Sequence, residues 1–520
     1  MTEICILEIS DVHGYWYPTD YRKRHQDMPM GLFKLQQLLN QEKANHPHTL
    51  LVDNGDFLQG SPLCYYLARI KDHRTVSDIY NRVGIDVGVL GNHEFNYGLN
   101  YLENTINQLN YPVLSANILK GHQPFTGEGI AWFEFDSVTV AVIGLTTSNI
   151  PIWEKPEYIE GLTFNDVVKT LEENLSKVTK QADVIVVSYH GGFERDLQTG
   201  EATEVSTGEN VGYELLTQFP EIDVLLTGHQ HRRIATTING TAVIQPGAKG
   251  STYGKVILDY HSETGKVSIR QTALVDVQES MPKLRLSQDD MALNSKVEDW
   301  LEERIAYVET LMIVNDAFEA RRSPHAFINL LNVIQMDLSG AEISCTALFG
   351  SGNGGFEGDV TMRDVIDNYP FPNTFNVLAL TGQDIKDALE MNATYFEVID
   401  GQLTVAKQFL EPKPQHYNYD IYSGIAYRYD ISKPIHQRVV ELKYQGRPMK
   451  MDDTFHVVMN SYRAVGGGGY SMFSADKIIK DIPVEGAQMI IDYLKAHPHL
   501  EIPNVTDFQV IYSRLNQDDG

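Results

Sequence analysis

The fold of this chain is constrained most by an alternation of short apolar runs and amphipathic segments through its first half. Apolar runs typical of buried strands cover residues 4–9, 49–52, 87–90, 138–145, 184–187 and 224–226. Segments with helical periodicity lie between several of them, for example at 31–41 and 165–179. Strands that alternate with helices predict a layered α/β domain, in which functional side chains gather at the ends of strands.

The length of the chain, 520 residues, predicts a second domain, because a single hydrophobic core stops growing at roughly 250–300 residues. A charged stretch at 281–312 carries apolar residues spaced as one helical face, namely Val297, Trp300, Leu301, Ile305, Val308 and Leu311. We interpret this stretch as a linker helix, and a second α/β pattern follows it. The sequence therefore predicts a first domain at 1–284, a linker helix at 285–312 and a second domain at 313–520.

The net charge of −27 argues against a long nucleic acid as partner, because the chain has no basic stripe that would overcome the repulsion. Small anions that are neutralised by bound cations are not excluded. The three cysteines, Cys5, Cys64 and Cys345, are odd in number and far apart, which excludes a disulfide framework and cysteine-rich zinc sites. We expect them to be buried thiols.

No membrane span is expected, because no run approaches the ~18 apolar residues that a spanning helix needs. The chain begins Met1-Thr2-Glu3 and enters a strand-like run without the basic and apolar regions of a secretory signal. This start predicts a cytoplasmic protein if Met1 is native. It predicts an extracellular or cell-surface protein if a leader has been removed.

Five short polar clusters follow or closely adjoin the predicted strands. They are Asp11-Val12-His13, Gly55-Asp56, Gly91-Asn92-His93-Glu94, His190-Gly191-Gly192 and Gly228-His229-Gln230-His231. Aspartate can bridge two cations, neutral imidazoles fill intermediate positions, and an amide oxygen adds a neutral ligand. A single histidine after a strand is more often a capping or core residue than a ligand. Five such clusters in this order indicate a metal site.

The order Asp-x-His, Gly-Asp, Gly-Asn-His-Glu, His and Gly-His-x-His resembles the calcineurin-like metallophosphoesterase superfamily. Residues 460–470, Asn-Ser-Tyr-Arg-Ala-Val-Gly-Gly-Gly-Gly-Tyr, resemble the substrate-domain signature of the 5′-nucleotidase family. Residues 53–62, 91–98 and 417–420 are most similar to the branch that acts as 2′,3′-cyclic-nucleotide 2′-phosphodiesterase and 3′-nucleotidase. The resemblance implies an α/β fold with an N-terminal layered β-sandwich flanked by helices, a linker helix and a C-terminal α/β substrate domain.

The resemblance also implies two divalent metal ions. Asp56 would bridge them, with one ion held by Asp11, His13 and His231 and the other by Asn92, His190 and His229. Oxygen and nitrogen ligands without sulfur favour Mn²⁺, Zn²⁺, Fe²⁺ or Co²⁺ over Ca²⁺, and the sequence does not choose among these four. Paired cations lower the pKa of a water molecule and neutralise phosphoryl oxygens, so hydrolysis needs no covalent intermediate.

His93 would face the substrate according to the same resemblance. An imidazole beside two metal ions suits protonation of a leaving alkoxide or stabilisation of charge on the phosphoryl group. The competing interpretation is a hydrogen-bond partner of a ligand. Asn96 stands where the 5′-nucleotidase branch usually has an aspartate that orients the catalytic histidine. Asparagine can accept a hydrogen bond but cannot stabilise an imidazolium by charge.

The predicted base site rests on Tyr419 and Tyr462, which match the family's two base-sandwiching aromatic positions, and on Gly467, which would let the loop approach the ligand closely. Without the resemblance, a tyrosine at either position is more often a core or edge-strand residue than a base-stacking one. Members that cleave 5′-nucleotides usually carry Gly-Gly-Gly-Ile-Arg, whose arginine binds phosphate. This chain has Asn-Gly-Gly-Phe-Glu at 353–357, so the cationic clamp is absent.

These features predict a metal-dependent hydrolase of nucleotide phosphate esters. The differences at Asn96 and at 353–357 favour 2′,3′-cyclic nucleotides and 3′-nucleotides as its small-molecule substrates. One alternative is a 5′-nucleotidase or UDP-sugar hydrolase that uses the same metals. The other is a non-catalytic nucleotide-binding protein, which would be expected to have lost a metal ligand.

Overall fold

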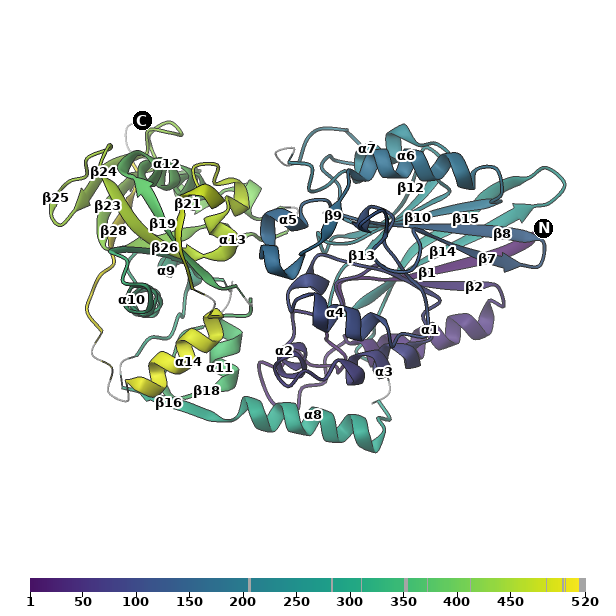
Figure 1. Cartoon of the computed structure of the whole chain (residues 1–520), viewed down its shortest axis with the longest axis horizontal. Coiled ribbons are helices and arrows are strands. Elements are labelled where there is room, and N and C mark those ends of the chain that lie inside the picture. Colours follow the sequence, from purple (N-terminus) through teal and green to yellow (C-terminus); the bar gives the residue numbers. More distant parts are fainter. Residues whose placement is uncertain are drawn as a thin grey trace, which may run out of the picture. The chain divides into compact units, whose positions relative to one another are not determined.

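The computed structural model describes residues 1–513 apart from 204–206, 282–283, 310, 350–353, 372, 412, 483, 498–499 and 501. The chain forms two compact units, 1–298 and 299–520, each with its own sheets and helices (Figure 1). Among the described residues, no helix combines the length and the apolar character that crossing a membrane would require.

Two six-stranded sheets form the first unit (Figure 1). The first has the order β15-β14-β1-β2-β3-β4, with β1 Thr2–Ile9, β2 Thr49–Asp53, β3 Val87–Val89, β4 Val113–Leu114, β14 Thr252–His261 and β15 Lys266–Asp276. The second has the order β12-β13-β11-β10-β8-β7, with β7 Ile130–Phe135, β8 Val138–Thr146, β10 Val184–His190, β11 Val224–Thr227, β12 Arg233–Ile238 and β13 Thr241–Pro246. Strands β1 to β4 run parallel, as do β8, β10, β11 and β13. All six predicted strands are confirmed.

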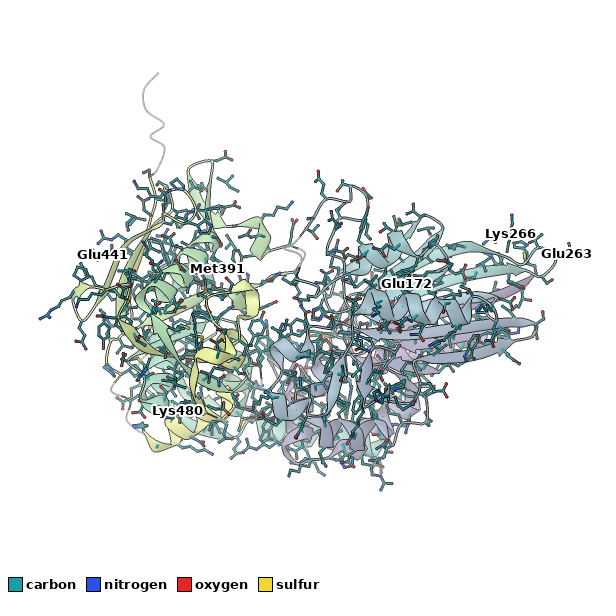
Figure 2. All side chains as sticks on the ribbon, turned by 45° about the horizontal axis from the view of Figure 1, so that its top comes forward. Glu172, Glu263, Lys266, Met391, Glu441 and Lys480 are labelled. Carbon is teal, nitrogen blue, oxygen red and sulfur yellow. The ribbon has the colours of Figure 1, made fainter. Side chains whose placement is uncertain are left out.

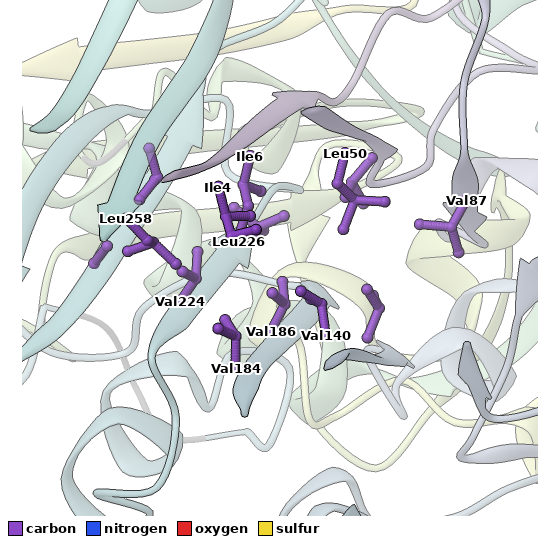
Figure 3. Packing of buried hydrophobic residues seen from close by; sticks show 14 of the residues in the cluster. Ile4, Ile6, Leu50, Val87, Val140, Val184, Val186, Val224, Leu226 and Leu258 are labelled. Atoms are coloured by element: carbon purple, nitrogen blue, oxygen red, sulfur yellow. The ribbon is translucent and has the colours of Figure 1, made fainter. Parts of the chain in front are cut away.

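The core of the first unit lies between the two sheets (Figure 3). Ile4 and Ile6 of β1 face Val184 and Val186 of β10 in this layer, and Leu226 of β11 completes it. A second apolar layer covers the other face of the second sheet under α6 Val167–Val178 and α7 Gly212–Gln218. The strands between these layers are buried on both faces, which explains why they form continuous apolar runs in the sequence.

Helices α1 Leu32–Asn45, α3 His73–Val83 and α4 Leu99–Ile106 run along the outer side of the first sheet (Figure 1). The helices predicted at 31–41 and 165–179 correspond to α1 and α6. Charged side chains such as Glu172, Glu263 and Lys266 point away from the body of the unit (Figure 2). The sandwich therefore has helices on both faces and a polar exterior.

The second unit is also an α/β fold. Its five-stranded sheet has the order β22-β17-β26-β19-β27, with β17 Ile343–Ala347, β19 Phe375–Thr381, β22 Asp420–Ser423, β26 Thr454–Asn460 and β27 Ile478–Ile482. A four-stranded sheet contains β23 Ile425–Asp430, β24 Val439–Tyr444, β25 Arg447–Pro448 and β28 Asp507–Ile511. The largest helices are α10 Ala326–Ser339, α12 Gly382–Asn392 and α14 Gly486–Ala496. Most of α10 is buried, in keeping with its position beside β17.

The predicted linker helix is shorter than expected. Helix α8 spans Gln288–Leu301, and the division between the two units falls inside it. Strand β16 Arg304–Val308 follows and pairs antiparallel with β18 Gly358–Thr361. The register shifts between Arg304 and Ala306, so Ile305 and Val308 are both buried although they are three residues apart. The bulge gives Ile305 and Val308 the spacing of a helical face inside a strand. The helix prediction beyond Leu301 is therefore wrong.

Candidate metal centre

The carboxyl ends of five parallel strands bring the seven predicted ligands together. The ligands are Asp11 and His13 after β1, Asp56 after β2, Asn92 after β3, His190 at the end of β10, and His229 and His231 after β11. Six of them are at most 8% exposed, and His231 is the open member. Two groups of potential ligand atoms share Asp56: one with Asp11, His13 and His231, the other with His190 and His229.

An unusual number of non-glycine residues near these strand ends adopt the left-handed backbone conformation. Positive φ angles of 52° to 65° occur at Asp11, His13, Asp56, His229 and His231. Non-glycine residues adopt this region rarely, and such strain persists where surrounding structure enforces it. These residues lie within four positions of the ends of β1, β2 and β11, so the unusual backbone conformation is confined to the loops that carry the ligands. Close approach is needed here as well, because a Cβ on Gly228 would lie 2.7 Å from Oδ2 of Asp11.

The first group surrounds Nε2 of His13. This atom lies 3.0 Å from Nε2 of His231 and 3.8 Å from Oδ2 of Asp56, and Nε2 of His231 is 3.2 Å from Oδ1 of Asp11. Nδ1 of His13 donates to the carbonyl of Gln59 at 2.7 Å, so the unprotonated Nε2 faces the centre. Burial lowers the pKa of His13 to about 3, which keeps this imidazole neutral and able to bind a cation.

The second group is built around His190 and Asp56. Nε2 of His190 lies 3.3 Å from Oδ2 of Asp56, and its Nδ1 donates to the carbonyl of Asn54 at 2.6 Å. Burial lowers the pKa of His190, but Asp56 with Asp11 and Glu94 outweighs it and raises the pKa to about 10. This imidazole therefore holds a proton that a metal ion would displace.

Oδ2 of Asp56 and Nε2 of His190 are buried and lie 3.3 Å from one another, and neither makes a hydrogen bond to any other described residue. Buried polar atoms left unpaired are costly and uncommon in folded proteins. Both atoms point at the place where the ligand sets meet, and the set combines oxygen and nitrogen donors. The residues therefore fit divalent cations.

Three acidic residues that sequence reasoning did not assign support this centre. The first is Glu94, which is fully buried. Its carboxylate accepts backbone N–H bonds of 2.5 to 3.1 Å from Asp56, Phe57, Leu58 and Gly91. Glu94 therefore clamps the loop after β2 to the loop after β3 and fixes the backbone of the bridging aspartate. Its place in Gly-Asn-His-Glu was the available signal.

The second is Glu209, whose Oε1 lies 2.8 Å from Nε2 of His229. Because Nε2 is engaged there, Nδ1 of His229 faces the centre, 2.8 Å from Oδ1 of Asn92. A carboxylate behind a histidine commonly orients a metal ligand. Trp153 stacks on the same imidazole, with ring centroids 5.6 Å apart and planes at 16°. No local motif marks either residue.

His93 lies beside the centre, as predicted. Its backbone N–H donates to Oδ1 of Asp56 at 2.9 Å, and its ring centroid is 5.2 Å from that of His13. Nδ1 of His93 is 2.6 Å from Oδ1 of Asn96. The amide of Asn96 donates in turn to Glu154, the third unassigned acid.

The structure does not place Tyr419 in an open base site. This side chain is fully buried in the second unit, where its hydroxyl donates to the carbonyl of Arg321 at 2.9 Å. Its ring stacks on Tyr395 with centroids 4.6 Å apart. A ring that the core already covers is not accessible to a nucleobase, so the prediction for Tyr419 is corrected.

Tyr417, two residues earlier, is half-buried and lies beside Tyr462, with ring centroids 6.5 Å apart and planes at 72°. A Cβ on Gly467 would lie 2.7 Å from Cζ of Tyr462, so this glycine is required by the tyrosine ring itself. Glu357 is exposed, and Asn353 lies outside the described residues. Tyr417 lies in the family-like segment 417–420, but the sequence alone predicts no role for it.

A buried arginine joins the segments that carry these two tyrosines. Nε of Arg463 donates to Oδ2 of Asp420 at 2.6 Å, and both side chains are at most 1% exposed. The guanidinium also donates to the carbonyls of Tyr417 and Gly467. Asp420 begins β22 and Arg463 follows β26, two strands that flank β17, so this pair ties two loops at one edge of the sheet.

This combination of a two-sheet sandwich with Asp, Asn and His at its parallel strand ends defines a calcineurin-like phosphoesterase. Residues 5–233 match the family model of that description, and residues 304–475 match the model of the 5′-nucleotidase C-terminal domain. The chain belongs to the calcineurin-like phosphoesterases that carry a 5′-nucleotidase C-terminal domain.

Among solved structures, the chain is similar to one from Staphylococcus aureus, named provisionally as a 5′-nucleotidase and in complex with alpha-ketoglutarate. The two are 46% identical over 98% of this chain and 100% of that chain, with a TM-score of 0.95. A 2′,3′-cyclic-nucleotide 2′-phosphodiesterase/3′-nucleotidase of Haemophilus influenzae is 27% identical over 95% of this chain and 84% of that protein. The trifunctional nucleotide phosphoesterase protein YfkN of Bacillus subtilis is 29% identical over 94% of this chain, which spans 38% of YfkN.

Proposed function

We propose that this protein hydrolyses phosphate esters of nucleotides with two divalent metal ions, and that 2′,3′-cyclic nucleotides and 3′-nucleotides are its preferred substrates. The observation that carries the proposal is that six Asp and His side chains form two groups of potential ligands that share Asp56, with Asn92 beside His229. The names of the Haemophilus and Bacillus relatives support the substrate class.

The metal ligands would divide into the two sets predicted from the sequence, with Asp56 common to both. When bound, the two cations would supply an activated water molecule and charge neutralisation for the phosphoryl oxygens. Glu94 holds the Asp56 backbone, Gln59 and Asn54 fix the tautomers of His13 and His190, and these contacts set the direction of each ligand atom. Pre-set ligands of this kind need little rearrangement to bind cations.

His93 is the proposed acid for the leaving oxygen. Its backbone is anchored to Asp56 and its Nδ1 to Asn96, so Nε2 is the ring atom left to face a substrate. The nucleobase would be held by Tyr417 and Tyr462 rather than by Tyr419 and Tyr462. Stacking of a base on an aromatic ring contributes about 1–3 kcal/mol.

The preference for cyclic and 3′-nucleotides rests on two differences from the 5′-specific pattern. Asn96 replaces the aspartate that pairs with the catalytic histidine, and Glu357 stands where a phosphate-binding arginine is usual. A 5′-nucleotidase is the second candidate, because the name of the Staphylococcus structure, at 46% identity, points to that activity.

One assay separates these candidates. Purified protein with Mn²⁺ is offered 2′,3′-cAMP, 3′-AMP, 5′-AMP and UDP-glucose, and kcat/KM is measured for each. We expect the first two to be turned over fastest. A clear preference for 5′-AMP would favour the second candidate, and absence of turnover with all four in the presence of Mn²⁺, Zn²⁺, Fe²⁺ or Co²⁺ would refute a nucleotide hydrolase.

A further inference from the structure

The side chain of Asn96 lies between two groups of different chemistry. Its Oδ1 is 2.6 Å from Nδ1 of His93, and its Nδ2 donates to Oε1 of Glu154. His93 begins the short helix η1 His93–Phe95 and Asn96 follows it, whereas Glu154 caps the C-terminus of α5 Ile150–Trp153. The contact therefore joins two segments that are 58 residues apart in the sequence.

An asparagine amide has two faces of similar shape, an oxygen that accepts and an NH₂ group that donates. Either face can be turned toward a histidine, and the choice decides which tautomer the imidazole adopts. An ionised carboxylate only accepts hydrogen bonds. Glu154 can therefore pair only with the NH₂ group of Asn96, which leaves the amide oxygen for His93.

We propose that Glu154 is a positioning residue for His93, because it fixes the amide of Asn96 and through it holds the proton of the neutral imidazole on Nδ1. Nε2 is then directed away from Asn96, and it is the ring atom at which the imidazole takes up the proton that it would give to the leaving oxygen. The inference deepens the proposed function and rests on it for its kinetic consequence. It also explains how an asparagine can serve where related chains use an aspartate.

The surroundings of Glu154 support this assignment. The carboxylate is half-buried, and burial raises its pKa to about 7, while the bond from Asn96 and the charge of Lys155 act in the opposite direction. At pH 8.5 the group is mostly ionised and acts as an acceptor. The residue before Glu154 also contacts the centre, because Trp153 at the end of α5 stacks on His229. The last residue of α5, Trp153, thus contacts His229, and the residue that follows the helix, Glu154, contacts Asn96.

A direct test observes the tautomer of His93. The Zn²⁺-loaded protein, labelled with ¹⁵N at histidine, is studied at pH 8.5 by long-range ¹H–¹⁵N correlation, and His93→Gln identifies the His93 signals. We expect the Nδ1–H form in the wild type and a weaker preference for it in Glu154→Gln, because the glutamine amide can donate to Asn96 as well as accept from it. Glu154→Ala should populate both tautomers. An unchanged Nδ1–H signal in Glu154→Ala would overturn the proposal.

A kinetic test uses rescue, with the nucleotide that the wild type turns over fastest. Glu154→Ala should lower kcat by about 10–100-fold, with KM unchanged, as is typical when the partner behind a catalytic group is lost. The double variant Glu154→Ala/Asn96→Asp should recover to within about threefold of the wild type, because both oxygens of a carboxylate accept from Nδ1–H. Failure of this rescue, with the double variant as stable as Glu154→Ala, would show a merely structural role.

The two tests separate the inference from the proposed function. If the wild type hydrolyses none of the four nucleotides, the proposed function fails. The tautomer measurement still decides the role of Glu154 in that case, because it requires no turnover. Thermal unfolding of each variant identifies any loss of fold.

Discussion

Two buried polar clusters, one in each unit, differ in how far the chain completes them. In the first unit, Oδ2 of Asp56 and Nε2 of His190 contact one another at 3.3 Å but make no hydrogen bond to the rest of the described chain. In the second unit, every nitrogen of the Arg463 guanidinium donates to Asp420 or to a backbone or side-chain oxygen nearby, although Oδ1 of Asp420 has no hydrogen-bond partner among the described residues. The first cluster therefore suits a cation as an additional partner, whereas the second cluster joins two loops of its own unit.

The two clusters would therefore gain different amounts of free energy from a bound ligand. Groups that remain unpaired in the fold gain most from a ligand, since the folded protein has already lost their hydration. A guanidinium whose nitrogens are all bonded stabilises the fold instead, here by joining the segments that carry Tyr417 and Tyr462. Four experiments test this difference between the two clusters.

The largest effect is expected at Asp56. Asp56→Asn removes the negative charge common to both ligand sets and should lower kcat/KM by at least roughly 10³-fold, because cation-assisted stabilisation contributes several kcal/mol. Phosphate release measures the loss. Asp223→Asn is the matched control: this carboxylate accepts from the backbone N–H of Ile185 at 2.8 Å, at the opposite end of β11. Equal losses in the two variants would refute the special role of Asp56.

The next effect concerns stability. Arg463→Met leaves Asp420 buried without its cation and should destabilise the second unit by about 3–5 kcal/mol. Unfolding of the second unit in urea is monitored by alkylation of Cys345, which measures this change. Alkylation of Cys64 monitors unfolding of the first unit in the same experiment. Arg322→Met is the control, because its pair with Glu319 is partly exposed and should contribute less than about 1 kcal/mol. A shift at Cys64 as large as that at Cys345 would contradict the division into two clusters.

Removal of metal should act on the first unit alone. A cation present at 100 times its dissociation constant stabilises the folded state by about 2.7 kcal/mol, and a chelator removes this contribution. Burial raises the pKa of the Cys64 thiol to about 12, so it resists alkylation while the loop after β2 is folded. With chelator, Cys64 should become reactive at a lower temperature than before, whereas Cys345 should not shift. Equal shifts of both thiols would argue against a metal centre confined to the first unit.

The smallest effect is expected at the tyrosines. Tyr417→Ala and Tyr462→Ala should each raise KM for a nucleotide by roughly 5–150-fold, which corresponds to about 1–3 kcal/mol of stacking, with little change in kcat. Tyr419→Leu removes the ring and should lower the stability of the second unit without raising KM, because that ring is in the core. A KM effect at Tyr419 and none at Tyr417 would restore the original prediction.

The sequence was sufficient for most of the first unit because its strands are buried on both faces and end in recognisable ligands. Ile4, Val184 and Val224 lie in uninterrupted apolar runs, and Asp11 and His229 follow such runs directly. Motif order then related these strand ends to one another, although only the fold shows that their side chains converge on one point.

Three features lay beyond the sequence for physical reasons. A bulge at 304–306 gave Ile305 and Val308 a helical spacing inside a strand. The choice between Tyr417 and Tyr419 depends on which ring the core of the second unit covers, and alternating residues do not reveal that. Glu154 and Glu209 reach the centre from segments with no motif, so only tertiary contacts identify them.

The left-handed backbone at five of the ligand positions sets stability against activity. Each such residue raises the energy of the fold by about 1–2 kcal/mol relative to glycine, which adopts this conformation freely. Selection for heat resistance alone, without a demand for turnover, would therefore accumulate glycine at residues such as His13 and His231 and erase the centre. A thermostable descendant of this protein that has lost its ligands would be the expected product of relaxed selection, not a sign of damage.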